Sequence, residues 1–345
     1  MKKMLALLLA LVMVLSLAAC ASSQPAAAST ETAETTETTE PAAEESAEAP
    51  AESGKTYTVG VCQLVQHEAL DAATQGFVDA LKEELGDAVT VDVQNASGDS
   101  VNCGTIVNGF VSKGVDLIMA NATPALTAAV SATADIPILG TSITAYGVAL
   151  DIDDFNGTVG GNVSGTSDLA DLQAQAQMIL DWFPETKTVG LLFCSAEPNS
   201  RYQIDEVRKA LEAQGVTCEE FAFTDSNDVS SVTQKAADFS DVVYIPTDNT
   251  AASNTEAIAN VLIPAGVPAI CGEEGLCRGC GVATLSISYY DLGVTTGKMA
   301  AKILKGEADI STMPVEYTDA TPKYNASICD QLGITPLDGY EAIDG

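Results

Sequence analysis

The sequence predicts an α/β protein of two tandem lobes, each built on a doubly wound parallel sheet, with a ligand cleft between them. Three observations lead to this fold class. Short apolar runs of strand length alternate with segments whose apolar residues recur at helical spacing, which is typical of parallel sheets covered by helices. The alternation stops at a Gly-rich stretch, 159–168, and then restarts with similar order and lengths. About 290 residues follow Lys55, which is too many for one ordinary core.

The first 55 residues carry a different pattern. Residues 1–20 combine a basic start, a short apolar run and small residues before Cys20, which predicts a lipoprotein signal peptide. Leu17-Ala18-Ala19-Cys20 has the form of a lipobox, so we expect a lipid on Cys20 to anchor the protein to the outer face of the bacterial cell membrane. The alternative is ordinary secretion. Residues 21–55 are almost all Ala, Ser, Thr, Glu and Pro, which predicts a disordered acidic tether.

The first lobe is predicted from hydrophobic periodicity. Apolar and alternating runs predict strands at 56–63, 89–94, 116–120 and 136–139. Apolar residues three and four positions apart predict helices at 70–85, 102–113 and 125–133. The glycines of the 159–168 stretch then predict a flexible connection to the second lobe.

The second lobe repeats the alternation. The same patterns predict strands at 188–194, 217–223, 242–245, 268–271 and 282–287. They predict helices at 169–183, 203–214, 229–238, about 249–262, and 292–305, the last closed by Gly306. We expect Thr166, Ser167 and Asp168 to cap the first of these helices.

The strand Val242–Ile245 leads to the strongest candidate site residue. Pro246 stops this strand, and a helix begins at Thr247, Asp248 or Asn249. A carboxylate therefore follows a parallel strand and begins a helix, at the sheet edge where open α/β proteins bind ligands. The alternative is that Asp248 serves only as the helix N-cap.

Several short motifs, taken together, resemble one family of proteins. They are Val59-Gly60-Val61-Cys62-Gln63, His67-Glu68-Ala69-Leu70-Asp71, Gly165-Thr166-Ser167-Asp168, Glu197-Pro198-Asn199-Ser200, Pro246-Thr247-Asp248-Asn249, Ile287-Ser288-Tyr289-Tyr290-Asp291-Leu292-Gly293 and Thr296-Gly297-Lys298-Met299-Ala300. On these residues, the chain from about Thr56 to Gln331 resembles the bacterial ABC-transporter solute-binding lipoproteins of the tryptophan/tyrosine (TrpX-like) family.

This resemblance implies a type I periplasmic-binding fold that closes on an aromatic or other apolar amino acid and delivers it to a permease with its ATPase. In that topology the chain crosses back late for one helix, which implies discontinuous lobes. We therefore expect the first lobe at 56–164 plus about 289–312 and the second at 165–288 plus about 313–345.

A zwitterionic amino acid enclosed between two lobes needs donors for its carboxylate and an acceptor for its ammonium group. Asp248 is the expected acceptor, and helix starts with hydroxyl or amide side chains are the expected donors. The full set of expected ligand residues is Gln63, Thr123, Thr166, Ser167, Asp168, Asn199, Ser200, Thr247, Asp248, Asn249 and Glu274.

Some of these expectations have open alternatives. Gln63 either lines the cleft or merely ends its strand, and Thr141 or Ser142 is a weaker candidate of the same kind. Glu273 and Glu274 follow the strand at 268–271 and either touch the ligand or face solvent.

Other conspicuous residues have structural interpretations. His67, the one histidine, is expected in a structural loop, Trp182 in the core, and Tyr289 in hinge packing. Cys277 and Cys280 have the CxxC spacing in a Gly-rich segment. A small-loop disulfide is the first interpretation and a reduced pair the second, because one such pair supplies only two metal ligands.

Charge and missing motifs exclude several functions. There are 48 acidic and 15 basic residues, for a net charge of −33, which argues against a nucleic-acid partner. The sequence has no Gly-x-Ser-x-Gly elbow, phosphate-binding loop or metal-ligand cluster, so we expect no enzyme, cofactor or metal. The leading hypothesis is a solute-binding component of an ABC importer for an amino acid. The alternatives are a sensor that presents its ligand to a signalling partner, and a binding protein for another small solute.

Overall fold

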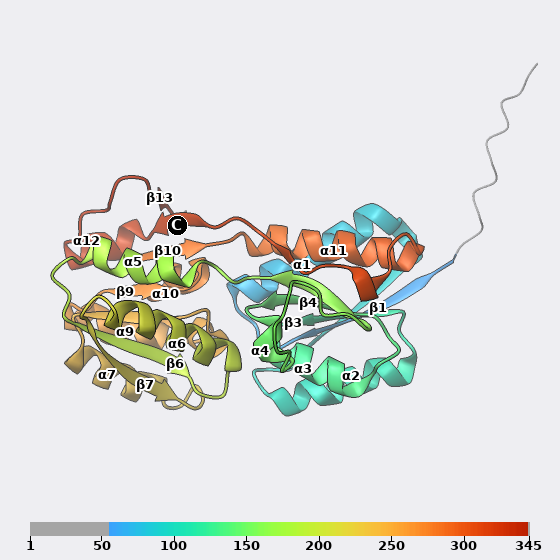
Figure 1. Ribbon diagram of the computed structural model, residues 1–345, viewed down its shortest axis with the longest axis horizontal. Helices are drawn as coiled ribbons and strands as arrows, with labels where there is room; N and C mark the ends of the chain where they lie inside the picture. The colour runs from blue at the N-terminus through green and yellow to red at the C-terminus, as the bar shows by residue number, and fades with distance from the viewer. Residues whose placement is uncertain (1–54, 344–345) are drawn as a thin grey trace, which may run out of the picture. The chain divides into compact units, whose positions relative to one another are not determined.

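The computed structural model describes residues 55–343, so the expected signal peptide and nearly all of the expected tether lie outside the described residues. Two sheets of mostly parallel strands, both flanked by helices, confirm the predicted α/β class. We call the first sheet with its helices the first lobe and the second sheet with its helices the second lobe (Figure 1).

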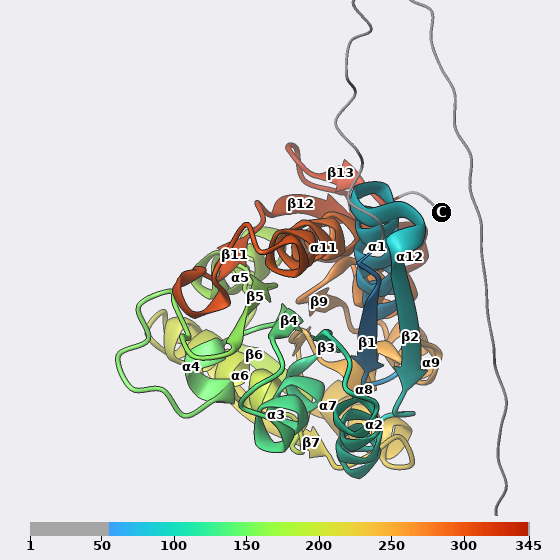
Figure 2. The same ribbon diagram turned by 90° about the vertical axis from the view of Figure 1, so that its right-hand side faces the viewer.

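The first sheet has the strand order β11-β5-β4-β3-β1-β2, and all of its pairings are parallel (Figure 2). Its strands are β1 (Tyr57–Gln63), β2 (Val89–Asn95), β3 (Leu117–Asn121), β4 (Ile138–Ile143), β5 (Val163–Ser167) and β11 (Glu316–Tyr317). The accompanying helices are α1 (Glu68–Leu85), α2 (Ser100–Lys113), α3 (Thr123–Ala132), α4 (Tyr146–Ala149) and α11 (Tyr289–Lys305), with 3₁₀ turns at Gly86–Ala88 and Ile310–Thr312.

The strands of this sheet bury side chains on both faces because successive residues point to opposite sides. Met119 packs on one face with Phe77 of α1 and Met299 of α11. Ile118 packs on the other face with Phe110 of α2, beside α3. This burial explains the continuous apolar runs in the sequence.

The second sheet has the order β13-β12-β10-β9-β8-β6-β7, parallel except for the antiparallel pair β10 and β12. Its strands are β6 (Thr188–Cys194), β7 (Thr217–Phe223), β8 (Val242–Ile245), β9 (Ala269–Cys271), β10 (Ala283–Ser286), β12 (Thr321–Tyr324) and β13 (Glu341–Ala342). One face packs against α5 (Leu172–Trp182), α6 (Pro198–Glu212) and α12 (Ala326–Leu332). The other packs against α7 (Val229–Phe239), α8 (Asn249–Ala252), α9 (Thr255–Ala265) and α10 (Glu274–Cys280).

Within the described residues the chain crosses between the sheets three times, after β5, after β10 and after β11. The residues at which the chain passes from one lobe to the other differ from the expected lobe boundaries. Position 164/165 falls inside β5, and β11 pairs with β5 in the first sheet. The glycines suggested a flexible connection, yet Gly165 is packed so tightly that a Cβ there would lie 2.0 Å from the Gly140 oxygen. The expected caps of α5 are also wrong, because the Asp171 side chain accepts from Gln173 N and Ala174 N instead.

The eight described cysteines are all free thiols, so the first interpretation of Cys277 and Cys280 as a disulfide is wrong. Both lie on α10, where Cys280 Sγ donates to the Leu276 oxygen at 3.3 Å. Glycines made this segment look like a loop, but Glu273 caps it as a helix. Trp182 is buried in the second lobe's core beside Tyr340, which confirms its expected role.

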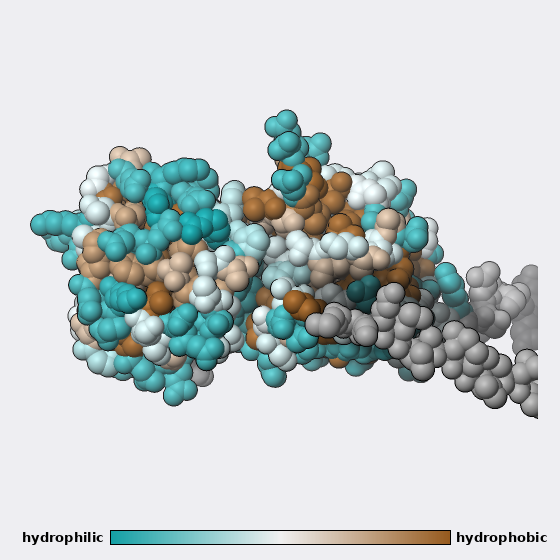
Figure 3. All heavy atoms as spheres, turned by 90° about the horizontal axis from the view of Figure 1, so that it is seen from below, coloured by the Kyte–Doolittle hydropathy of each residue, from teal (hydrophilic) through white to brown (hydrophobic). Residues whose placement is uncertain are grey.

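The surface of the described part is mixed in character. Figure 3 shows hydrophilic and hydrophobic side chains interspersed over the visible face of the second lobe. None of the helices within residues 55–343 combines the length and the apolar character that a membrane span needs.

Helices α1 and α11 lie together over the first sheet, and glycines make their close contact possible (Figure 1). A Cβ on Gly293 of α11 would lie 2.0 Å from the Ala73 oxygen of α1. A Cβ on Gly76 would lie 2.1 Å from the Tyr290 oxygen. Backbone meets backbone at both points, so a neighbouring side chain cannot turn aside to make room.

We predict that Gly293→Ala lowers the free energy of unfolding by about 1–3 kcal/mol, because the added methyl group forces the two helices apart. Urea denaturation of both proteins measures the difference. Gly104→Ala in α2 is the matched control, since a Cβ there meets nothing within 4 Å and should stabilise the helix by about 0.5–1 kcal/mol. Equal stability of Gly293→Ala and the parent protein would contradict this account.

Candidate ligand-binding site

A narrow cavity lies between the two lobes, where the carboxyl ends of their strands meet. Its lining residues are His67, Leu70, Ser142, Thr144, Asp168, Asn199, Thr247, Asp248, Asn249, Ala252, Glu273 and Tyr289. Its accessible volume is about 10 Å³, room for about one water molecule, so a larger ligand requires the lobes to move apart. The location is the strand edge that parallel-sheet proteins use for ligands.

Asp248 is one of the residues that the second lobe contributes to the cavity lining. It is 1% exposed, and its two oxygens accept from Cys194 N at 2.6 Å and Ala251 N at 2.8 Å. Asp248 caps α8 and also lines the cavity, so capping is not its only structural role, and its contact with a ligand stays a prediction. Burial, followed by the charge of Glu197, raises the pKa of Asp248 to about 8.

Glu197 connects the starts of two helices behind the cavity. Its carboxylate is 4% exposed and accepts from Asn249 Nδ2 at 2.6 Å, Thr250 N at 2.9 Å and Asn199 Nδ2 at 3.1 Å. It thereby orients the side chains of Asn199 and Asn249. The motif containing Glu197 is visible in the sequence, but its function as an acceptor for a second helix depends on tertiary structure.

His67 reaches across from the first lobe. Its Nε2 lies 3.2 Å from Asn249 Oδ1, and since an amide oxygen can only accept, Nε2 donates. Burial lowers the pKa of His67, which keeps the ring neutral at physiological pH. The expectation of a structural loop missed the place of His67 in the cavity wall, because the sequence does not show which part of the second lobe meets it.

Asp168 and Tyr289 lie where the chain crosses between lobes. The Tyr289 hydroxyl donates to Asp168 Oδ2 at 2.9 Å, and burial raises the pKa of Asp168. Tyr289 thus combines the expected hinge packing with a place in the cavity wall.

Three buried polar atoms of the lining have no hydrogen-bond partner within residues 55–343: Ser142 Oγ, Asp168 Oδ1 and Asn199 Oδ1. Ser142 also has a φ of +55°, in the left-handed region that side chains rarely adopt. Unpaired buried polar groups are costly, and strained backbone concentrates at binding sites. Their location on one cavity indicates that a polar ligand supplies the partners.

Glu273 and Glu274 have different surroundings. Glu273 is 2% exposed, lines the cavity and caps α10 through Gly275 N and Leu276 N; burial raises its pKa to about 7. Glu274 pairs with Arg278 and Lys323 outside the cavity lining. The structure therefore does not bring the expected Glu274 to the cavity and brings its neighbour instead, because adjacent residues at a helix start point in different directions.

Five further expected residues are absent from the lining: Gln63, Thr123, Thr166, Ser167 and Ser200. Most of them make contacts within a lobe. The Gln63 amide bonds Asp71 and Thr74, the Thr166 hydroxyl lies 2.9 Å from that of Thr296, and Ser167 Oγ donates to the Thr144 oxygen. Ser200 contacts Asp248 and supports it from behind.

The ionisable side chains of the cavity lining include three acidic groups. Asp168, Asp248 and Glu273 contribute carboxyl groups, and within residues 55–343 the lining contains neither Lys nor Arg. Burial raises the pKa of all three. A cationic group placed among them would stabilise their ionised forms.

Solved structures share this architecture. The ABC domain from Streptococcus pneumonia in complex with L-Trp is 32% identical, covers 84% of this chain and 100% of its own, and gives a TM-score of 0.79. A conserved domain protein from Vibrio cholerae is 30% identical with the same coverage and a TM-score of 0.80. The ligand-free, open structure of a substrate-binding protein with adhesive properties from Clostridium difficile is 34% identical, covers 84% of this chain and 99% of its own, and gives 0.64. The lobes thus match the L-Trp complex more closely than the open structure.

A relative found by sequence comparison is also a binding protein for an aromatic amino acid. A curated "Tyrosine-binding protein" from Clostridioides difficile (strain R20291) is 32% identical over 276 residues, which cover 78% of this chain and 79% of that protein. These relatives confirm the predicted type I periplasmic-binding fold. The family model described as "ABC transporter substrate binding protein" matches residues 58–339, so the chain belongs to this family of extracytoplasmic, non-enzymatic solute-binding proteins.

Proposed function

We propose that this protein binds the zwitterion of an aromatic amino acid in the interlobe cavity and delivers it to the permease and ATPase subunits of an ABC importer. The observation that carries the proposal is the cluster of buried carboxyl groups in a cavity lined by neither Lys nor Arg within residues 55–343. The "Tyrosine-binding" relative and the L-Trp complex support an aromatic ligand.

The ammonium group pairs with Asp248 in this proposal. The Asp248 carboxylate already accepts two backbone N–H bonds, which hold it in position for a charged partner. A hydrogen bond between two ionised groups is about twice as strong as one between neutral groups. The unpartnered oxygens Asp168 Oδ1 and Asn199 Oδ1 are further acceptors for the same ammonium group.

The carboxylate of the ligand requires donors from the first lobe. Ser142 Oγ is buried in the lining without a partner in the described part, and its left-handed backbone holds it at the end of β4. Leu70, Ala252 and Tyr289 supply the apolar part of the lining for an aromatic ring. A ligand held by both lobes would shift the open–closed equilibrium toward the closed form.

We also propose that Cys20 carries the lipid that retains the protein at the outer face of the membrane. Cys20→Ser should abolish incorporation of labelled palmitate in the producing bacterium, because serine has no thiol to carry the lipid. A parallel Cys218→Ser variant controls for losing a cysteine as such. Palmitate labelling of Cys20→Ser at the parental level would refute the anchor.

Thermal unfolding with a panel of solutes tests the ligand class. L-Tyr, L-Trp or L-Phe at 100 times its dissociation constant should stabilise the folded protein by about 2.7 kcal/mol. N-acetyl-L-tyrosine, which lacks the ammonium group, should give no shift, whereas the parent amino acid should. Stabilisation by aliphatic amino acids alone would contradict the aromatic ligand, and equal shifts from the N-acetyl compound would contradict the ammonium site.

The pH dependence of binding tests Asp248. Binding an ammonium group requires the ionised carboxylate, and the pKa of Asp248 is raised to about 8 in the buried site. Affinity should therefore fall as pH decreases from 8 to 5, by up to about tenfold per pH unit. Titration calorimetry at several pH values measures this, and a flat profile would exclude Asp248 as the ammonium partner.

Asp248→Asn should lose about 2–5 kcal/mol of binding free energy and most of the pH dependence, because the amide carries no charge. The amide can still accept from Ala251 N, but its NH₂ group faces the Cys194 N–H, so the melting temperature of the variant is measured alongside its affinity. Asp228→Asn, at the N-cap of α7, is the matched control and should bind normally.

A further inference from the structure

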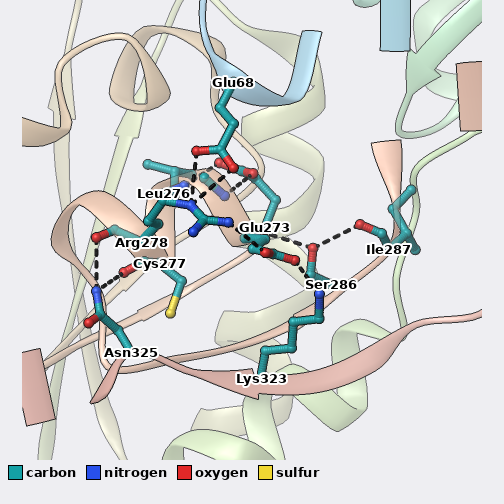
Figure 4. A network of polar contacts seen from close by, with 11 residues as sticks. Glu68, Glu273, Leu276, Cys277, Arg278, Ser286, Ile287, Lys323 and Asn325 are labelled. Atoms are coloured by element: carbon teal, nitrogen blue, oxygen red, sulfur yellow. Dashed lines mark hydrogen bonds and ion pairs between the residues drawn. The ribbon is translucent and has the colours of Figure 1, made fainter. Parts of the chain in front are cut away.

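Arg278 of α10 reaches from the second lobe to the first. Its Nε lies 3.1 Å from both carboxylate oxygens of Glu68, in the first turn of α1 (Figure 4). Its Nη2 donates to Glu274 Oε1 at 2.8 Å, and Glu274 Oε2 accepts from Lys323 Nζ at 2.5 Å. The guanidinium therefore lies between one carboxylate of each lobe.

This network borders the ligand cavity without entering it. Glu68 follows His67 and Glu274 follows Glu273, and both His67 and Glu273 line the cavity. Glu68, Glu274 and Lys323 instead line a separate hollow beside the crossing segments, with Ile287 and Tyr289. The side chains of Arg278 and Glu68 are 34% and 51% exposed.

The contacts of Arg278 differ in their dependence on lobe position. Arg278, Glu274 and Lys323 all belong to the second lobe, so their contacts persist whatever the first lobe does. The contact with Glu68 joins different lobes, so it is made only when the lobes are together. A contact made in one state and lost in the other shifts the equilibrium between them.

Glu68 has no capping role that would explain its position. The N-cap of α1 is His67, which makes no side-chain capping bond, and the described hydrogen bonds of the Glu68 carboxylate go to Arg278. Basic residues are scarce in this chain, 15 against 48 acidic ones. One of these few cations is placed at the lobe interface.

We propose that Arg278 and Glu68 form a closure latch, an ion pair that holds the lobes closed over the ligand without touching it. The latch stabilises the closed form and slows the escape of the ligand. Its effect on ligand release rests on the proposed amino acid binding, whereas its effect on lobe opening does not.

The expected size follows from the exposure of the pair. Partly exposed ion pairs contribute modestly, and salt screens them. The single Nε–H of Arg278 is shared between the two carboxylate oxygens of Glu68, which is a three-centre contact. We expect loss of the latch to raise the dissociation rate of L-tyrosine by about twofold to fivefold.

Glu68→Gln, Arg278→Gln and the double variant test the latch in the full-length protein. Each single variant should release radiolabelled L-tyrosine about twofold to fivefold faster, and the double variant should be no faster than the faster single one. Raising the salt concentration should accelerate release from the parent protein and have little effect on the variants. Lys113→Gln, which removes an ion pair to Asp92 inside the first lobe, is the matched control and should release at the parental rate.

A measurement without ligand separates the latch from the proposed function. Spin labels at the exposed positions Asp135 and Glu212, one on each lobe, report the interlobe distance. Glu68→Gln should shift the distance distribution toward longer values in the absence of any amino acid. Failure of L-Tyr, L-Trp and L-Phe to bind would refute the proposed ligand while this shift still supported the latch. An unchanged distribution together with an unchanged release rate would overturn the latch.

Discussion

The second lobe is arranged around the need to keep the Asp248 carboxylate satisfied away from water. Cys194 N, at the end of β6, reaches one oxygen because β6 and β8 are neighbouring parallel strands, and Ala251 N, in the first turn of α8, reaches the other. Glu197 lies behind it and positions the adjacent asparagines. A buried carboxylate with a raised pKa is costly to maintain unless it receives a cation. The buried Asp248 carboxylate is therefore costly in the empty protein and well suited to pair with the ammonium group of a ligand.

Hydrophobic periodicity was sufficient to predict most helices and strands, because both sheets bury strands whose apolar runs are long enough to recognise. It failed where small polar residues form a strand. Val163–Ser167 has no apolar run, yet its lack of bulk is what lets it pack between β4 and β11. Glycine likewise suggested flexibility at 165 and at 279, where the structure shows close packing.

The candidate site was only partly predictable. Residues at the helix starts that follow strands on the correct edge, such as Asp248 and Asn199, were identifiable from sequence because parallel strands end together. The sequence offered Ser142 and Glu273 only as open alternatives, and it did not offer His67. Their places depend on a left-handed backbone angle, the direction of a side chain at a helix start and the meeting of two lobes. Thr166 and Gln63 lie on the correct edge but direct their polar groups into their own lobe.

The glycine-mediated contact of α1 with α11 has a mechanical consequence. With backbone against backbone at Gly76 and Gly293, the two helices have no side-chain layer in which to slide. Together with the first sheet they form a single block, and α1 carries His67 and Glu68 at its leading end. Bending is then confined to the three crossing segments. His67 and Glu68 therefore move together with the whole first lobe when the two lobes separate.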